Sequence, residues 1–488
     1  MKKQITALLA LLAVAPLAFG QNPSAQRSAA PKPAASKITV ASQNALSPAA
    51  FGYNTQTLRG PGWDKKPFLD RIAQLDPGNF RYPGGTVGNY WDWKTGYLNE
   101  IGRQRGVMST SKNGPFPYML EDVKRVYDRS GGRAEPIYML NMLTSTYEYQ
   151  LEMLKHARAI GLPVRYIELG NEFYMDNHPK GYTNLTNYPN IKDYVDTCRI
   201  WVPKLRKEFP GARFAMIAIN NPSGWTGANR QRSRDWNREV IENMGDLEVE
   251  AFTFHSYAKN TYEDQTPADM IAQSLAQVDF SGNDRGIPAK YTFWVTEYNF
   301  YQVDNRLPGL WVTGLANVLM TGNMLATPGI ELVCLHNITA SDISTAIYDQ
   351  PVKIFGGNMT EKYALSASGQ ALKVFAQGEH GATAIKKLAF SNNPAYPGRG
   401  GKGHSEYNAL YGYLFTGAGD KAVLVNVGDK PMTVELAGLG FKPASAEQTW
   451  AESLATPVVN DNSVKKETIP LTGKGQLVLR PCSVTLVK

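Results

Sequence analysis

The stretch VRYIELGNEFYM, residues 164–175, begins as a buried strand and then breaks its own pattern. The run ends in Gly170, Asn171 and Glu172, so an amide and a carboxylate stand where a β-strand passes into a turn. A single glutamate in such a place carries little information. Its meaning depends on whether the other strands of the chain end in the same way.

Seven further runs share the apolar, β-branched and aromatic character of this one. Near-continuous apolar runs are typical of parallel strands that are covered on both faces. The eight runs therefore predict eight parallel strands. In chain order they span residues 49–56, 79–85, 135–143, 165–172, 213–221, 249–257, 291–300 and 330–338.

Between these runs lie segments in which apolar residues recur three and four positions apart, and several stop at glycine, as helices commonly do. Eight strands alternating with eight helices predict an α/β fold, a (β/α)8 TIM barrel over residues 45–378. An open, doubly wound sheet is the alternative. It is disfavoured because GYNTQTLRG, residues 52–60, lacks the GxGxxG loop expected after the first strand of that fold.

After residue 378 the pattern changes to short alternating strands separated by turn signals. This change predicts a C-terminal antiparallel β-sandwich over residues 379–488. The early segment 37–44 has the same character and is expected to add a strand to that sandwich. A Gly/Pro-rich loop, residues 391–407, interrupts the first two strands, and the sequence leaves open whether it reaches over the barrel mouth.

The first 36 residues resemble an export signal followed by a leader. Residues 1–20 combine Lys2 and Lys3 with an apolar run and a small-residue cleavage site, which predicts a bacterial Sec signal peptide. The run is shorter than the roughly 20 apolar residues of a spanning helix, so no membrane insertion is expected. Residues 21–36, rich in Pro, Ala and Ser, predict a flexible leader. We therefore expect an exported protein, periplasmic or secreted.

Charge and composition argue against several other classes of function. The formal net charge is +8, but much of it lies in the first 37 residues, at Lys2, Lys3, Arg27, Lys32 and Lys37. The remainder shows no basic stripe of the kind that binds nucleic acid. The sequence contains no CxxC motif, no HExxH motif and no histidine cluster, so no metal or cofactor is predicted. The oligomeric state is left open.

Every one of the eight expected strands ends in polar side chains. In barrels of this kind the strand-to-helix loops build the reactive face. A pocket for a hydroxyl-rich ligand needs many fixed donors and acceptors of this sort. The residues at the strand ends are Asn54 and Gln56, Arg81 and Tyr82, Asn141, Asn171 and Glu172, Asn220 and Asn221, His255 and Tyr257, Glu297 and Tyr298, and His336 and Asn337.

Two carboxylates stand out among these strand ends, Glu172 after the fourth strand and Glu297 at the end of the seventh. Strands four and seven lie across an eight-stranded ring from each other, so we expect both side chains to converge at the mouth. Glycoside hydrolysis uses two such carboxyl groups, about 5–5.5 Å apart in retaining enzymes and about 6.5–9.5 Å apart in inverting ones. The strand ends therefore favour this chemistry.

Two short segments, ELGNEFY (168–174) and WVTEYNFY (294–301), resemble the signature segments of the clan A glycoside hydrolases. RYPGGTVGNYWDW (81–93) and the terminal sandwich further resemble the α-L-arabinofuranosidases, the β-xylosidases and the heparanase and β-glucuronidase family. The resemblance implies a retaining enzyme that cleaves a polysaccharide or its oligosaccharides by double displacement. An arabinofuranoside, xyloside or uronide substrate is implied, while the linkage and the choice between exo and endo action stay open.

The same resemblance implies roles for the residues at the strand ends. Glu172 matches the general acid/base, which in this clan follows an asparagine at the end of strand four. Glu297 matches the nucleophile at the end of strand seven. Asn171 would then hydrogen-bond the sugar 2-hydroxyl, a contact that strengthens in the transition state.

Further positions are implied to support this pair. Arg81 and His255 match residues that hold the nucleophile ionised and oriented, and either Tyr257 or Tyr298 is expected to donate to its carboxylate. The remaining candidates for substrate contact are Asn141, Trp91 and Trp93, of which the two tryptophans offer aromatic surfaces to a sugar ring.

Each of these residues also has a plain structural interpretation. Glu172 could be a helix N-terminal residue favoured by the dipole, Arg81 an ion-pair partner, and His255 a hydrogen-bonded core histidine. The tryptophans could simply be packed. For the whole protein, the competing hypothesis is a carbohydrate-binding protein without catalysis on a barrel of the same kind, because fold alone does not fix function.

Overall fold

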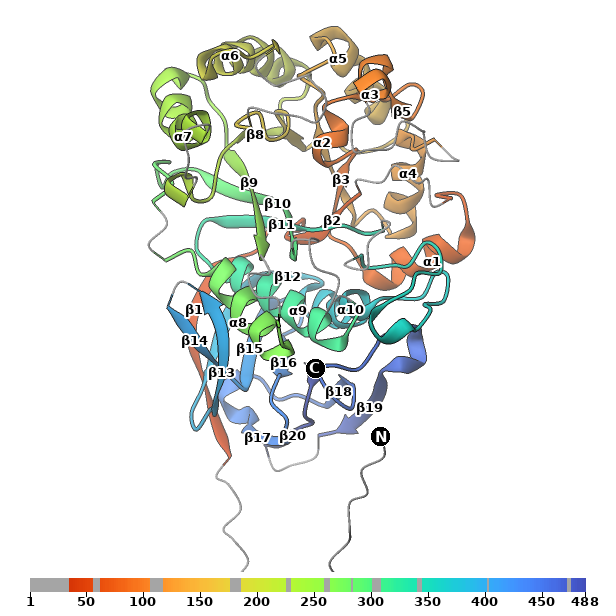
Figure 1. Ribbon diagram of the computed structural model, residues 1–488, viewed down its shortest axis with the longest axis vertical. Helices are drawn as coiled ribbons and strands as arrows, with labels where there is room; N and C mark the ends of the chain where they lie inside the picture. The colour runs from red at the N-terminus through yellow and green to blue at the C-terminus, as the bar shows by residue number, and fades with distance from the viewer. Residues whose placement is uncertain are drawn as a thin grey trace, which may run out of the picture. The chain divides into compact units, whose positions relative to one another are not determined.

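The computed structural model describes residues 35–55, 62–105, 117–175, 186–224, 230–258, 264–281, 284–300, 309–339, 345–401, 403–471 and 475–488. Its centre is a closed barrel of eight parallel strands (Figure 1). The strands are β2 (Phe51–Asn54), β3 (Asn79–Tyr82), β6 (Glu135–Met139), β7 (Tyr166–Glu168), β8 (Arg213–Ile217), β9 (Ala251–Ala258), β10 (Thr292–Phe300) and β11 (Ile330–His336). The predicted TIM barrel is confirmed. The expected signal peptide, and the leader up to residue 34, lie outside the described residues.

A helix follows each barrel strand. The first seven return the chain to the start of the next barrel strand, and the last leads into the C-terminal region. Threonine or serine caps begin several of them, as at Thr266, whose side chain accepts from the backbone N–H of Asp269. The eight helices are α1 (Lys66–Leu75), α4 (Leu120–Arg129), α5 (Tyr147–Ala159), α6 (Ile191–Glu208), α7 (Gln231–Met244), α8 (Pro267–Val278), α9 (Trp311–Leu325) and α10 (Ala367–Glu379).

An insertion between β3 and α4 adds short elements next to the barrel. They are α2 (Gly85–Gly88), the antiparallel pair β4 (Trp91–Asp92) and β5 (Tyr97–Leu98), and α3 (Glu100–Arg105). The described part of the chain also includes the 3-10 turns η4 (Pro222–Gly224), η6 (Phe355–Gly357), η7 (Leu436–Leu439) and η8 (Asp461–Ser463).

The C-terminal region forms a sheet of nine strands. In spatial order these are β19 (Lys465–Pro470), β18 (Ser445–Trp450), β21 (Ser483–Val487), β16 (Lys421–Asn426), β15 (Leu410–Gly417), β12 (Ala382–Phe390), β1 (Ser36–Ala45), β17 (Met432–Glu435) and β20 (Gln476–Leu479). The early strand β1 thus joins this sheet, antiparallel to β12. Its contact with β17 is parallel, so the region is mostly and not wholly antiparallel.

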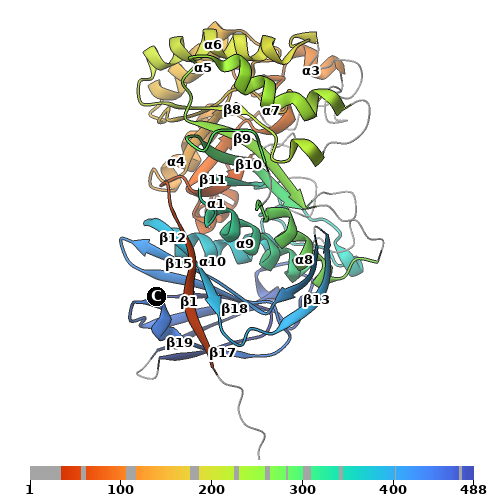
Figure 2. The same ribbon diagram turned by 90° about the vertical axis from the view of Figure 1, so that its left-hand side faces the viewer.

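The Gly/Pro-rich loop of residues 391–407 contains a β-hairpin, β13 (Ala395–Gly401) and β14 (His404–Asn408). The hairpin lies beside α8 (Figure 2). Arg399 anchors it, because its guanidinium bonds to Asp269 at 2.6 Å and to Asp264 at 2.9 Å near the start of that helix. The hairpin therefore packs on the outer wall of the barrel.

Helices α8, α9 and α10 lie between the barrel strands and the sheet, whereas α5, α6 and α7 lie on the side away from it (Figures 1 and 2). Every residue of α9 is buried. One row of rings runs from the barrel to the sheet, with Phe375 of α10 5.8 Å from Phe51 and 5.3 Å from Phe415. Barrel and sheet therefore share one apolar core.

A layer of large side chains fills the lower part of the barrel interior. Tyr166 and Trp294 meet edge to face with ring centroids 5.4 Å apart, and both are buried. Glu331 accepts hydrogen bonds from Arg213 and from the indole of Trp294 at the starts of the strands. Access to the polar strand ends is therefore from the opposite, carboxyl end. Among the described residues, no helix combines the length and apolar character needed to cross a membrane.

Candidate active site

The two carboxylates singled out by the sequence converge on one histidine. Glu297 lies within β10, and Glu172 lies in the turn that follows β7. His255 Nδ1, from β9, lies 2.7 Å from Glu172 Oε1 and 3.6 Å from Glu297 Oε2. The distance between Glu172 Oε1 and Glu297 Oε2 is at most the sum of these two contacts. That sum is below the about 6.5–9.5 Å that separates the two carboxyl groups in inverting glycosidases. The two carboxyl groups therefore lie close enough to act on one bound molecule.

Glu297 is held as an anion by its surroundings. Its Oε1 accepts from Arg81 Nη1 at 2.7 Å and its Oε2 accepts from the Tyr257 hydroxyl at 2.5 Å. Burial alone would raise the pKa of this carboxyl, but His255, His336 and Arg81, together with the Tyr257 hydrogen bond, hold it well below its usual range. A carboxylate kept ionised in this way can serve as a nucleophile.

Arg81 is fully buried on β3 and connects several parts of the site. Besides Glu297, its Nε and Nη2 bind both oxygens of Glu168 at 2.6 and 2.9 Å, and Nη2 also donates to Asn171 Oδ1 at 2.8 Å. The fork geometry of a guanidinium suits such bidentate pairing. Glu168 thus neutralises Arg81 and fixes the plane in which it meets Glu297.

Thr296 links this network to the histidine. Its hydroxyl donates to Glu168 Oε1 at 2.9 Å and lies 3.3 Å from His255 Nε2. Since the Thr296 hydrogen points to Glu168, its oxygen is the acceptor for a hydrogen on Nε2. Burial lowers the pKa of His255, but Glu297 and Glu172 outweigh that effect and raise it. Its Nδ1 faces Glu172 Oε1, so the doubly protonated imidazole donates to Thr296 from Nε2 and to Glu172 from Nδ1.

Glu172 has a second donor that the sequence reasoning missed. The Tyr174 hydroxyl donates to Glu172 Oε1 at 2.9 Å, so this oxygen accepts from both Tyr174 and His255. Glu172 itself has φ of 54°, in the left-handed region that favours glycine, and it follows Gly170 with φ of 90°. The turn rather than a regular helix start therefore aims this side chain.

Asn171 lies between the two carboxylates with one side of its amide held. Its Oδ1 accepts from Arg81 and its backbone carbonyl accepts from Asn89 Nδ2 at 2.9 Å. Its Nδ2 is buried and has no hydrogen-bond partner among the described residues. A buried amide donor without a partner is costly, so a ligand acceptor would fit here.

The other tyrosine considered for Glu297 is turned away from it. Tyr298 bonds to Thr321 of α9 at 2.5 Å, on the outer side of the barrel wall. Adjacent residues of a strand point to opposite faces, so Tyr298 cannot follow Glu297 inward. Tyr257 lies two residues after His255 on β9 and shares its face, which is why it is the donor.

Three further candidates have structural partners outside the carboxylate cluster. Trp93 donates to the backbone of Tyr149 at 3.1 Å and packs against that ring, so it is not placed beside the two glutamates. Trp91 donates to the Tyr82 hydroxyl at 3.2 Å. Asn141 donates to the backbone carbonyl of Trp91 at 3.2 Å and so holds the β3–α4 insertion in place.

Besides Tyr174, two residues of this network were not found from the sequence, Glu168 and Thr296. Glu168 falls inside the short strand β7, where a charged residue in an apolar run was interpreted as part of the strand. Thr296 precedes Glu297 directly, so simple alternation would put one of them outside. A shift of register between Val295 and Glu297 on β10 lets both point inward.

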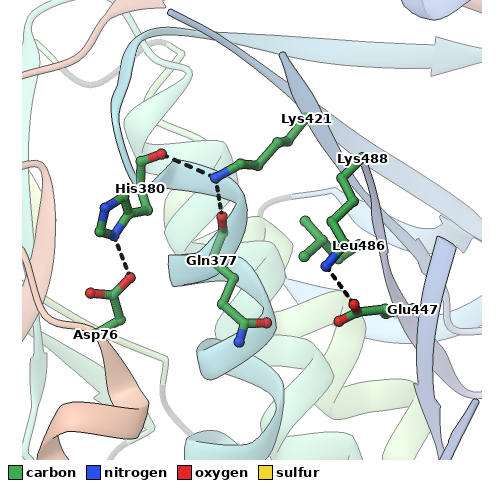
Figure 3. Close-up of a pocket in the computed structure, with 7 residues that line it drawn as sticks. All are labelled: Asp76, Gln377, His380, Lys421, Glu447, Leu486 and Lys488. Carbon is green, nitrogen blue, oxygen red and sulfur yellow. Dashed lines mark hydrogen bonds and ion pairs between the residues drawn. The ribbon is translucent and has the colours of Figure 1, made fainter. Parts of the chain in front are cut away.

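A separate hollow of about 330 Å³ lies where the barrel meets the sheet (Figure 3). Its polar side chains are paired with one another, as in the 2.7 Å contact between His380 Nδ1 and Asp76 Oδ2. Lys421 donates to the backbone carbonyls of Gln377 and His380 at 2.8 and 3.2 Å. These contacts join α1, α10 and β16, and neither Glu172 nor Glu297 lines the hollow.

No protein-family model and no curated protein matches this chain, but solved structures do. A family 51 α-L-arabinofuranosidase from Bifidobacterium longum superposes with a TM-score of 0.66 at 13% identity, covering 93% of this chain and 99% of that one. The GH51 α-L-arabinofuranosidase from Thermotoga petrophila RKU-1 gives 0.62 at 15% identity, with the same coverage. This chain shares their fold.

The same fold extends to another activity. A 4-O-α-L-rhamnosyl-β-D-glucuronidase from Fusarium oxysporum 12S superposes with a TM-score of 0.59 at 14% identity, covering 93% of this chain and all (100%) of that one. The barrel and the added sheet are therefore matched along nearly the whole length of these chains. The resemblance to clan A barrels noted in the sequence is confirmed as a resemblance of fold.

Proposed function

We propose that this protein is a retaining glycoside hydrolase in which Glu297 is the nucleophile and Glu172 the acid/base. The observation that carries the proposal is the convergence of both carboxylates on His255 Nδ1, at 2.7 and 3.6 Å. The residues around them divide the tasks. Glu297 is surrounded by cationic groups that keep it ionised, whereas Glu172 lies in a turn with its own two donors.

In the first step, Glu297 Oε attacks the anomeric carbon of the bound sugar and forms a glycosyl ester. The bond from that carbon to the leaving oxygen breaks, and this oxygen takes the proton of Glu172. In the second step, Glu172, now a carboxylate, takes a proton from water as the water oxygen attacks the same carbon. The ester bond to Glu297 breaks, and two inversions leave the configuration retained.

Asn171 supplies a contact that suits this mechanism. Its Nδ2 is the buried donor without a partner among the described residues, and it lies on the residue next to Glu172. We propose that it donates to the sugar 2-hydroxyl, a hydrogen bond that strengthens in the transition state. Arg81 fixes the amide by binding its Oδ1, so the donor needs no reorganisation when the sugar binds.

The proposed substrate is an arabinofuranoside, a xyloside or a uronide within a polysaccharide or an oligosaccharide. The support is the likeness of fold to two α-L-arabinofuranosidases and to a rhamnosyl-glucuronidase. A screen of 4-nitrophenyl glycosides (α-L-arabinofuranoside, β-xyloside, β-glucuronide, β-galactoside and β-glucoside) would identify the sugar. Release of 4-nitrophenol from one of them above the blank is the expected result.

A mechanism-based 2-deoxy-2-fluoro glycoside of the same sugar tests the assignment of the nucleophile. We expect one equivalent of covalent label on the peptide that contains Glu297, detected by mass spectrometry. Binding of the sugar without label and without turnover would instead support a carbohydrate-binding protein that lacks catalysis. Label on another carboxylate would contradict the assignment while keeping the reaction class.

We also propose that the protein is exported, on the support of the N-terminal pattern of Lys2, Lys3 and the apolar run that follows. Expression of the full chain in a bacterial host, followed by N-terminal sequencing of the periplasmic and secreted fractions, tests this. A mature protein that begins after residue 20 is the expected result. Full-length protein confined to the cytoplasm would contradict it.

A further inference from the structure

Tyr174 is held in a position from which it donates a hydrogen bond to Glu172. Its hydroxyl donates to Glu172 Oε1 at 2.9 Å across a turn of only three residues. The ring is fixed from outside the turn, because it packs edge to face against Trp236 of α7 with centroids 6.1 Å apart. The backbone carbonyl of Tyr174 also accepts from Ser233 Oγ at 3.0 Å. The hydroxyl therefore holds its position independently of a bound sugar.

The oxygen that Tyr174 contacts is the same one that His255 contacts. With Tyr174 OH and His255 Nδ1 both donating to it, Oε1 has used its in-plane lone pairs. A proton placed on Oε1 would meet two donor hydrogens. The acidic proton of Glu172 is therefore directed to Oε2.

We infer that Tyr174 is a positioning residue that, together with His255, confines the exchangeable proton of Glu172 to Oε2 and so aims it at the leaving oxygen. The inference rests on the proposed glycosidase function and adds to it a residue that never touches the substrate. Burial raises the pKa of the Tyr174 hydroxyl well above its usual value, so it stays a donor throughout the working range.

The charged and titratable groups at the mouth come from several elements. From β9 come His255 and Tyr257, from β10 Glu297, from β3 Arg81, and from the turn of Glu172 itself Tyr174. Loss of the Tyr174 hydroxyl removes one of the two groups that hold Oε1 and leaves His255 as the other.

The substitution Tyr174→Phe tests this inference, since it removes one oxygen and keeps the ring on Trp236. The readout is the pH profile of kcat/KM for two glycosides of the sugar found in the screen, a phenyl and a 2,4-dinitrophenyl glycoside. Phenol needs a proton to leave and dinitrophenol does not. We expect kcat/KM to fall about tenfold for the phenyl glycoside and to stay within about twofold for the other across the profile.

A second readout separates positioning from a general structural role. With the dinitrophenyl glycoside, the slower second step of Tyr174→Phe should lower kcat and KM together, because Glu172 also acts there as base. The matched control is Tyr188→Phe, which removes a buried hydroxyl from the same aromatic cluster, one that donates to the Met142 carbonyl at 2.7 Å. The leaving-group dependence should not change in that variant.

Two results would overturn the inference. One is an equal loss on both glycosides, which would assign Tyr174 to the fold alone, and the other is a wild-type profile in Tyr174→Phe. Failure of the proposed function would look different. In that case the wild-type protein itself would release neither phenol nor dinitrophenol from any sugar in the screen.

Discussion

Arg81 and Arg133 each contact two carboxylates and are largely buried. The pKa values of the carboxyl groups that they contact are nevertheless shifted in opposite directions, as Glu297 and Glu379 show. At the barrel mouth Arg81, with 0% of its side chain exposed, contacts Glu297 at 2.7 Å. Where the barrel meets the sheet, Arg133, 14% exposed, contacts both Glu379 and Asp76. The pKa of Glu297 lies well below its usual range, whereas that of Glu379 is raised from 4.5 to about 7.

The number of positive groups around each carboxylate explains the difference. Both side chains are buried, which by itself raises a carboxyl pKa. Glu297 has His255, His336 and Arg81 beside it, and these outweigh burial. Around Glu379, burial is the largest effect, and the one close arginine is shared with Asp76, whose charge raises the pKa further. An arginine contact alone therefore does not make a buried carboxylate a strong acid.

Removal of either carboxylate at the mouth should give the largest effect. Glu297→Ala removes the proposed nucleophile and Glu172→Ala the proposed proton donor, so we expect kcat to fall about 10⁴-fold or more in each. Steady-state kinetics on the 4-nitrophenyl glycoside found in the screen measures this. Added azide should restore turnover in Glu297→Ala with a glycosyl azide of inverted configuration. Turnover close to wild type in both variants would refute the assignment.

Neutralising the second partner of Arg81 should have the next largest effect. Glu168→Gln keeps the shape of the side chain but leaves the whole Arg81 charge to Glu297, which holds that carboxylate more tightly and slows its attack. We expect kcat to fall about 100-fold with KM nearly unchanged. The rate of covalent labelling by the fluoro glycoside should fall in parallel.

A matched control for this change is Glu135→Gln. Glu135 is also a mostly buried barrel carboxylate paired with an arginine, Arg165 at 2.6 Å, but it lies at the start of β6, away from the site. Its substitution should affect stability and leave kcat within about twofold. Equal losses of kcat in the two variants would mean that Glu168 acts only through the fold.

At the barrel–sheet junction the expected effect is on stability and not on activity. Because the Glu379 carboxyl has a higher pKa folded than unfolded, its contribution is most favourable below pH 4.5 and is lost as the pH rises to about 7. Glu379→Gln removes this dependence. Its free energy of unfolding, relative to wild type, should rise by up to about 3 kcal/mol between pH 4.5 and 8.

Urea unfolding of wild type and Glu379→Gln at both pH values measures this difference. Activity should be the same in the two proteins, since Glu379 lies at the end of α10 and pairs with Arg133 just before β6 begins, at the other end of the barrel strands from Glu172 and Glu297. If the difference in free energy of unfolding between the two proteins does not change with pH, the prediction is wrong. Arg133 would then offset the effect of burial on the Glu379 pKa as fully as the positive groups at the barrel mouth do for Glu297.

The smallest effect is expected from the two tyrosines that the sequence could not tell apart. Tyr298→Phe removes a bond to Thr321 in the barrel wall and should cost about 1 kcal/mol of stability with activity kept. Tyr257→Phe removes the donor to Glu297 and should lower kcat about tenfold. A fall of kcat in Tyr298→Phe that exceeds the fall in Tyr257→Phe would reverse this assignment.

The fold could be predicted from the sequence because its signals are local. Each barrel strand is a short apolar run, and polar residues follow it, so Glu172 and Glu297 could be found at matching places. A carboxylate at a strand end is visible in a single sequence. The convergence on His255 follows once the ring closes, because β9 and β10 are neighbours with His255 opposite Glu297.

The residues that were missed depend on tertiary detail. Glu168 has the same letter whether its strand faces the core or solvent, and only the closed barrel shows Arg81 beneath it. Thr296 points inward because of a register shift in β10. The pattern of apolar and polar residues in that strand does not reveal the shift. The hairpin of residues 395–408 is ordered by Arg399 pairing with acids more than a hundred residues away, and such a partner cannot be read from the loop itself.

Helix α9 is buried along its whole length between barrel and sheet. The C-terminal region is therefore an integral part of the barrel's packing and not a separable domain. Gly322 of α9 lies so close to the Tyr413 ring that an added methyl would come within 2.2 Å of it, and Trp311 of the same helix donates to the Cys482 carbonyl at 2.7 Å. The side of the barrel that bears Glu297 is thus packed against the C-terminal sheet. The side that bears Glu172 is covered by α5, α6 and α7, which lie away from that sheet (Figure 2). Engineering of the barrel should therefore begin on the side that bears Glu172, where changes in loop length leave the shared core intact.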